Sequence, residues 1–218
     1  MVRRLRAHAR RAGPRGVPQR PRDHAARTPG DPGDDRSGGS AMSEWYEAAD
    51  EPELVEHGAV SGLAVSGRGA PGGAAYIESV GALYAVMGAL GAPMVPLEGR
   101  WWVEDERPPL DVPRDEWRWH LFLRLPDETA SIDRARAEVL VKVPAAARVQ
   151  HATYTDGLCV QVMHHGAYSD EPASLARMDA LMEAEGVAHF GLHHEIYLSD
   201  PSETDSAKMH TILRQPVR

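Results

Sequence analysis

The stretch HHEIYLSDP, residues 193–201, gathers several side chains that can do chemistry. Imidazoles bind metals and move protons near neutral pH. A carboxylate can orient or deprotonate water, and a phenol can donate a hydrogen bond to a developing oxyanion. Three interpretations are therefore open: a metal site, an acid–base site, or an ordinary polar strand.

Strand geometry decides which of these side chains can act together. Neighbouring residues of a strand point to opposite faces, so His193, Glu195 and Tyr197 share one face. We expect the opposite face, which carries Ile196, to pack on helices and to leave Glu195 and Tyr197 facing a cleft. A carboxyl group walled by aromatic rings is partly desolvated, which raises its pKa. The alternative, a solvated or salt-bridged Glu195, stays open at this point.

A metal site is not favoured by the spacing of the candidate ligands. His164 and His165 are adjacent, and so are His193 and His194, with Glu195 directly after them. Each adjacent pair on a strand offers at most one inward nitrogen, whereas zinc sites need three or four converging ligands. Neither H-E-x-x-H nor a pair of C-x-x-C motifs occurs. The sequence predicts no metal and no other cofactor.

Tryptophans are concentrated in one part of the chain. Trp101, Trp102, Trp117 and Trp119 lie within nineteen residues of each other. Four tryptophans can simply form a core, but two adjacent ones on a strand cannot both point into it. Flat aromatic faces directed into a cavity stack on planar ligands or hold a cation. The cluster therefore favours a small-molecule site.

Charge and cysteine content limit the classes of function. Residues 42–218 carry fourteen Lys and Arg against twenty-eight Asp and Glu, a balance of −14 that argues against nucleic acid as the main partner. A neutral or cationic small molecule fits better. The single cysteine, Cys159, is typical of a reducing cytosol and is expected to be a buried apolar residue rather than a nucleophile. Without a run of about 20 apolar residues, we predict a cytoplasmic protein that does not bind membranes.

Residues 1–41 differ in composition from the rest of the chain. They contain ten Arg and four Asp, many Pro and Gly, and hardly any large apolar side chains. Such a segment cannot bury enough surface to offset the entropy of ordering, so we predict a disordered extension followed by one domain at 42–218. The extension lacks the apolar region of a signal peptide and the periodicity of a helix-turn-helix. It is either an upstream extension of the reading frame, with Met42 as the natural start, or a basic arm that touches nucleic acid.

The domain carries a weak internal repeat that predicts its fold. LFLRLP (121–126) and TILRQP (211–216) lie 90 residues apart, each at the end of a strand–helix–strand–strand series. Two such units can pair their antiparallel strands and form a cleft between the halves. The expected strands are 60–67, 94–104, 117–127, two strands around an Asp156–Gly157 turn, 193–200 and 209–217, and the expected helices are 75–90, 131–143 and 170–185.

The chain resembles the GyrI-like small-molecule-binding family from about Tyr46 to Val217. The resemblance rests on PLEGRWW, WRWHLFLRLPD, CVQVMHHGAYSDEPASLARM, HHEIYLSDP and ILRQPV, in the family's order and spacing. It implies an α+β fold of the GyrI/SOUL-like type, in which duplicated strand–helix–strand–strand units form an antiparallel sheet with a ligand cleft between the halves. This agrees with the repeat.

The motifs LEGRWW and HHEIYLSDP look like those of a subfamily of cyclopropanoid cyclopropyl hydrolases. That likeness implies a metal-independent hydrolase that opens the cyclopropane of yatakemycin- and duocarmycin-type DNA alkylators, and so gives detoxification or self-resistance. Carried over by position, the implied catalytic residues are Glu195 and Tyr197, and the implied substrate-binding residues are Trp101, Trp119, Phe190, His165 and Tyr168.

The alternative is a protein that sequesters planar or cationic drugs without chemistry. In either case we expect a monomer or weak homodimer whose partner is a planar aromatic small molecule rather than nucleic acid or a membrane. MHHGAYSD departs from the family's usual MHIGPYD at His165 and Ala167, which leaves the identity of the substrate open.

Overall fold

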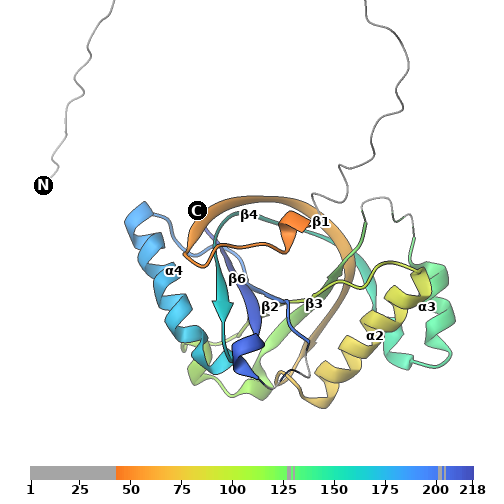
Figure 1. The fold of residues 1–218 in the computed structure, drawn as a ribbon. Helices are drawn as coiled ribbons and strands as arrows, with labels where there is room; N and C mark the ends of the chain where they lie inside the picture. The colour runs from red at the N-terminus through yellow and green to blue at the C-terminus, as the bar shows by residue number, and fades with distance from the viewer. Residues whose placement is uncertain (1–42, 127–128, 130, 201–202, 204) are drawn as a thin grey trace, which may run out of the picture. The chain divides into compact units, whose positions relative to one another are not determined.

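The computed structural model describes residues 43–126, 129, 131–200, 203 and 205–218, so the predictions for residues 1–41 lie outside the described residues. Six antiparallel strands close into a barrel in the order β1-β3-β2-β5-β6-β4 (Figure 1). The strands are β1 (Glu53–Arg68), β2 (Leu97–Trp102), β3 (Arg118–Arg124), β4 (Gln150–His165), β5 (His193–Tyr197) and β6 (His210–Pro216). The helices are α2 (Ala74–Leu90), α3 (Asp133–Leu140) and α4 (Glu171–Glu185).

The predicted duplication is confirmed. The chain runs β1-α2-β2-β3 and then, after α3, β4-α4-β5-β6. The three strands of each half are neighbours in the barrel, and the halves meet where β2 pairs with β5 and where β4 pairs with β1. A site built from β2 and β5 therefore draws on both halves.

The predicted turn at Asp156–Gly157 is wrong, because β4 is one continuous strand. Its antiparallel register with β1 runs without a shift from Glu53↔Gln161 to Ala64↔Gln150. Gly157 adopts a positive φ of 68°, which distorts the strand locally but does not reverse it. The pairing with the long strand β1 on both sides of the Asp-Gly pair outweighs its local turn preference. The start of β1 was also missed, since polar and apolar residues are mixed before Val60 and none of them is buried.

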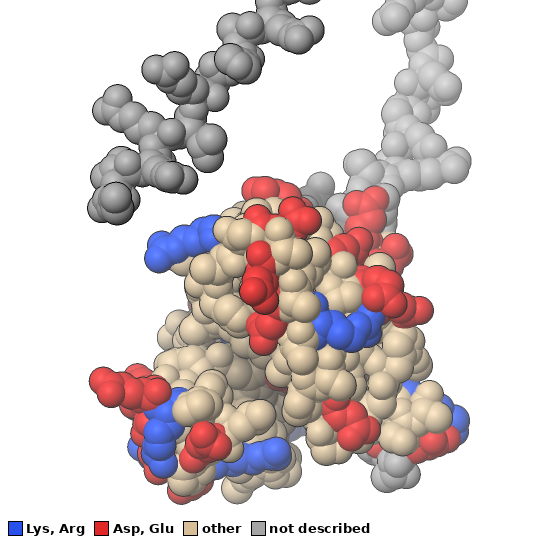
Figure 2. All heavy atoms as spheres, turned by 90° about the vertical axis from the view of Figure 1, so that its left-hand side faces the viewer, with Lys and Arg blue, Asp and Glu red and all other residues tan. Residues whose placement is uncertain are grey.

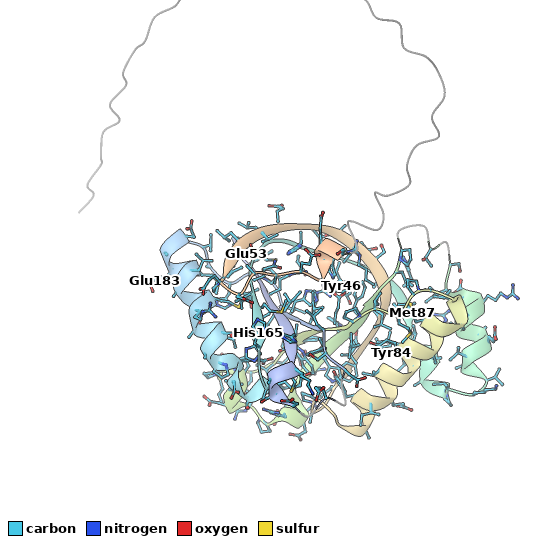
Figure 3. All side chains as sticks on the ribbon, in the orientation of Figure 1. Tyr46, Glu53, Tyr84, Met87, His165 and Glu183 are labelled. Carbon is cyan, nitrogen blue, oxygen red and sulfur yellow. The ribbon has the colours of Figure 1, made fainter. Side chains whose placement is uncertain are left out.

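The helices pack on the outside of the barrel, α2 and α3 on one side and α4 on the other (Figure 1). Met87 of α2 is fully buried, and Figure 3 shows it with Tyr84 on the side of α2 next to the barrel. The apolar spacing of helix 75–90 would place Ile77 on this face, but Ile77 is 61% exposed. The buried stripe instead runs through Leu83 and Val86. None of the described helices is long and apolar enough to cross a membrane.

The side chains of β5 alternate between two faces as predicted, but the helices lie on the face opposite to the predicted one. Ile196 is buried inside the barrel, where it packs in one cluster with Trp45, Phe122 and Ile212. Glu195 and Tyr197 point to the outer face, the side on which α2 packs around Tyr197. The barrel interior, rather than the helices, takes the apolar face, because a closed sheet provides an enclosed surface of its own.

Candidate functional site

A hydrogen-bonded chain links the two halves of the protein on the outer face of β2 and β5. The Trp101 indole N–H donates to the Tyr197 hydroxyl at 2.9 Å, and that hydroxyl donates to Glu195 Oε2 at 2.6 Å. Strand alternation and the pairing of Gly99 with Glu195 bring these side chains to one face. The indole therefore orients the phenol, and the phenol orients the carboxylate.

Gly99 makes room for this chain. A Cβ atom at position 99 would lie 2.8 Å from Trp101 Nε1 and 3.0 Å from the Tyr197 hydroxyl oxygen. Contacts this short force a side chain or the backbone to move. The glycine in LEGRWW thus lets the indole and the phenol cross the strand pair close to the backbone.

Further aromatic rings surround the hydrogen-bonded side chains Trp101, Tyr197 and Glu195. Tyr76 of α2 stacks on Trp101 at a centroid distance of 6.0 Å and meets Trp119 edge-on at 5.8 Å. Trp117 meets Trp101 edge-on at 6.0 Å, and the Tyr168 ring lies edge-on to Tyr197 at 5.9 Å. Tyr168 is 47% exposed whereas Trp119 is fully buried. These rings form an aromatic wall. Trp119 lies at its buried side, and Tyr168 lies at its exposed edge.

Among the residues that the structure describes, no Lys or Arg side chain pairs with Glu195. Its side chain is 14% exposed, and burial raises its pKa above the ordinary range, although the hydrogen bond from Tyr197 works in the opposite direction. His193 Nε2 lies 3.6 Å from Glu195 Oε1, beyond hydrogen-bond distance. Burial, together with the neighbouring His194, lowers the pKa of His193 to about 4, so at neutral pH its ring carries no charge to balance the carboxylate.

The structure adds Glu171, which the sequence analysis missed. It is the first residue of α4, where the preceding Asp170 and the following Pro172 read only as helix-start signals. Its Oε1 atom is buried and has no hydrogen-bond partner among the described residues. Burial first, and the charge on Glu195 second, raise the pKa of Glu171 well above its ordinary range. A lone acidic residue directly before a helix-starting proline gives no signal of this environment in the sequence.

Two predicted substrate-binding residues lie elsewhere. Phe190 is 51% exposed, and the Arg218 guanidinium lies 4.8 Å from its ring centroid. His165 is bonded to Asp50 at 2.7 Å and lies near α4, across the barrel from Tyr84 in Figure 3. The structure therefore brings together five of the seven predicted residues, namely Trp101, Trp119, Tyr168, Glu195 and Tyr197.

Beside Tyr197 the surface opens into a hollow of about 360 Å³. Its lining is mostly apolar and comes from the end of β5, the segment before β2 and one residue of α2. The lining residues are Tyr84, Met94, Val95, Pro96, Leu97, Tyr197, Leu198, Ser199 and Asp200. Tyr197 belongs both to the lining of the hollow and to the hydrogen-bonded chain, so the hollow adjoins the residue that donates to Glu195.

A second group of charged side chains lies inside the barrel. His194 Nδ1 is 2.8 Å from Asp156 Oδ2, and His194 Nε2 is 3.0 Å from Glu98 Oε2. Arg100 donates to Asp156 at 3.1 Å, and all these groups are almost fully buried. Among the described residues, no group of three or more His, Cys, Asp and Glu side chains is arranged to hold a metal ion.

Cys159, also buried on β4, is held as a neutral thiol. Burial, followed by the nearby charge of Asp156, raises the pKa of Cys159 to about 12. A neutral buried thiol is a poor nucleophile, which agrees with the expected structural role.

The chain is similar to several proteins of known structure. An uncharacterized conserved protein from Listeria innocua is 33% identical, with a TM-score of 0.74, and the match covers 82% of this chain and 98% of that one. A hydrolase from Listeria innocua is 32% identical, with a TM-score of 0.71 and the same coverage. The EcmrR C-terminal domain shares the fold at 14% identity and a TM-score of 0.55, with 77% of this chain and 97% of that one covered.

A family model described as a GyrI-like small molecule binding domain matches residues 124–218. No protein of curated function matches significantly.

Proposed function

This chain belongs to the family with a GyrI-like small-molecule-binding domain, and we propose that it is a hydrolase that opens the cyclopropane ring of duocarmycin- or yatakemycin-type alkylators. The hydrolase name of a relative at 32% identity supports hydrolysis as the class of reaction. The motifs LEGRWW and HHEIYLSDP support the narrower substrate class. A metal-independent reaction fits a site whose reactive groups are a carboxylate and a phenol.

The proposed substrate fits the shape and polarity of the site. Alkylators of this type are flat, conjugated and mostly apolar, so their rings can pack against the exposed edge of the aromatic wall at Tyr168. The apolar hollow beside Tyr197 provides room for the remainder of the molecule. With the body of the alkylator in the hollow, its three-membered ring would lie next to Glu195.

Ring opening then needs one base and one hydrogen-bond donor. Glu195 accepts a proton from a water molecule while the water oxygen bonds to the unsubstituted ring carbon. The strained carbon–carbon bond breaks, and its electron pair moves through the conjugated system to the carbonyl oxygen. The Tyr197 hydroxyl can turn from Glu195 to this oxygen and stabilise its negative charge. The product is the alcohol of the opened ring with a phenol, and water is the only other reactant.

The observation that supports this proposal most is the hydrogen bond from Tyr197 to a carboxylate that is 14% exposed and pairs with no Lys or Arg in the described part of the chain. Desolvation makes such a carboxylate a stronger base than one in water. The test is to incubate catalytic amounts of protein with a duocarmycin-type alkylator and to follow the hydrated product by mass spectrometry. We expect many turnovers per protein, and a rate for Glu195→Gln that is lower by about 10²- to 10⁴-fold. An unchanged rate for Glu195→Gln would show that Glu195 is not the base.

Sequestration without chemistry is the second candidate function. The acidic balance of the chain and a carboxylate beside aromatic rings both favour a bound cation. In that case each protein molecule removes only one molecule of alkylator from solution, and no hydrated product accumulates. Glu195→Gln would then weaken the binding of cationic ligands more than that of neutral ones.

A role in resistance follows from either activity. If the protein removes the alkylator, deletion of its gene should lower survival in the presence of that compound. Equal survival of the deletion strain and its parent would contradict this role.

A further inference from the structure

We infer that Glu171 is a second catalytic carboxyl group, which delivers a proton to the carbonyl oxygen as the ring opens. This inference rests on the proposed function and adds an acid to a site in which Glu195 is the base.

Glu171 belongs to the wall of the same site. It is the first residue of α4 and follows directly on the short 3₁₀ turn Tyr168–Asp170. The ring of Tyr168 lies edge-on to that of Tyr197 at 5.9 Å, so this turn lies against the Glu195–Tyr197 pair. The charge on Glu195 contributes to the raised pKa of Glu171, in agreement with this position of the turn.

The hydrogen bonds of the two carboxyl groups assign them different protonation states. Glu195 Oε2 accepts a hydrogen bond of 2.6 Å from Tyr197, which stabilises the ionised form. Glu171 Oε1 is buried and accepts none from the described residues, and an ionised oxygen in that position would be costly. Two close carboxyl groups with raised pKa values share one proton, and this proton therefore resides on Glu171.

The other charged and titratable groups around the pair do not reverse this assignment. Arg114, which follows the loop after β2, favours ionised Glu171, but less than burial and Glu195 oppose it. Tyr76 on α2 and Tyr168 both have raised pKa values and stay neutral. His193 on β5 is neutral at pH 7 because burial lowers its pKa to about 4.

The place of Glu171 at the start of a helix makes it suited to give up its proton. The N-terminus of a helix stabilises negative charge through its free N–H groups and its dipole. The helix N-terminus therefore reduces the cost of the buried carboxylate that forms when Glu171 protonates the substrate oxygen. Water gives its proton to Glu195, Glu171 gives its proton to the oxygen, and transfer of a proton from Glu195 to Glu171 restores the starting state.

A pH profile of kcat/KM with a duocarmycin-type alkylator tests the inference. In the wild type we expect a fall on the acid side, where Glu195 takes up a proton, and a second fall on the basic side, where Glu171 loses its own. Glu171→Gln should lower kcat/KM by at least tenfold and remove the basic limb, because a glutamine has no proton to lose. A basic limb that persists in Glu171→Gln would overturn the role of Glu171.

An infrared or carboxyl-carbon NMR measurement on the free protein separates this inference from the proposed function. Glu183→Gln, an exposed change on the same helix, is the matched control (Figure 3). We expect the signal of a protonated carboxyl at neutral pH in the wild type and in Glu183→Gln, and its loss in Glu171→Gln. If this signal is present but no alkylator is hydrolysed, the proposed function fails and the shared proton stands. If no protonated carboxyl is seen, the inference about Glu171 fails even where turnover is found.

Discussion

Buried carboxylates occur in two regions of this protein, and they are treated in opposite ways. Inside the barrel, Asp156 faces His194, Arg100 and Arg214. Burial by itself would raise the pKa of Asp156, but these three partners outweigh it and hold the pKa below the ordinary range. On the outer face, burial raises the pKa values of Glu195 and Glu171, and it outweighs the hydrogen bond from Tyr197 to Glu195 and the charge of Arg114 near Glu171.

The carboxyl groups of the two regions therefore differ in what they can do. Carboxylates with cationic partners stay ionised and connect strands that are not neighbours, as Arg100 of β2 and Asp156 of β4 do across the barrel. Carboxyl groups without such partners destabilise the fold slightly but can exchange protons near neutral pH. Other acidic and basic side chains lie on the surface, as Figure 2 shows for one face of the molecule.

Removal of the interior carboxylate should have the largest effect on stability. Asp156→Asn leaves Arg100, Arg214 and His194 with too little negative charge around them, and we expect a loss of about 3–5 kcal/mol in the free energy of unfolding. Urea denaturation measures it, with the exposed Asp179→Asn as control. The folded fraction of Asp156→Asn should keep its rate of alkylator hydrolysis. Equal stability of the two variants would show that the interior ion pairs do not stabilise the barrel.

Crowding of the outer site should have the next largest effect. In Gly99→Ala the new methyl group lies 2.8 Å from Trp101 Nε1 and 3.0 Å from the Tyr197 hydroxyl, so the hydrogen-bonded chain must shift. We expect a loss of about 1–3 kcal/mol in stability and a drop in turnover of roughly tenfold or more. Gly81→Ala is the control, since its methyl group meets nothing within 4 Å and lies in α2, where alanine is favoured. Normal turnover in Gly99→Ala would mean that the hydrogen bonds from Trp101 to Tyr197 and from Tyr197 to Glu195 do not position the carboxylate.

The two regions should also respond differently to pH. In the unfolded chain Glu195 ionises near the ordinary glutamate pKa of 4.5, whereas the folded protein holds its pKa higher. Ionisation of this group therefore costs stability as the pH rises above about 4.5. Glu195→Gln should therefore match the wild type below pH 4.5 and become more stable by about 1–2 kcal/mol at pH 8. Thermal unfolding at several pH values measures this gain. A variant that is less stable than the wild type at pH 8 would contradict the desolvation of Glu195.

Most of the fold could be predicted from the sequence, because helix 75–90 and the strands of the two repeats have clear periodicity. The alternation of side chains also placed Glu195 and Tyr197 on one face with Trp101. Closure of the sheet could not be predicted, and for that reason the apolar face of Ile196 was assigned to helices rather than to the barrel interior. Glu171 was missed because its environment arises from tertiary contacts, in which the turn before α4 brings Tyr168 against Tyr197 of β5.

The smallest effect is expected from the hollow beside Tyr197. Met94 is 69% exposed at its rim, so an indole there can partly fill the hollow without disturbing the core. Met94→Trp should raise KM several-fold for an alkylator with an extended aromatic appendage. It should leave KM nearly unchanged for a truncated alkylator that retains only the cyclopropane-bearing unit. Stability should stay within about 0.5 kcal/mol of the wild type, as for other surface changes. An unchanged KM for both compounds would place the body of the alkylator outside the hollow. The aromatic wall at Tyr168 would then be left as its binding surface.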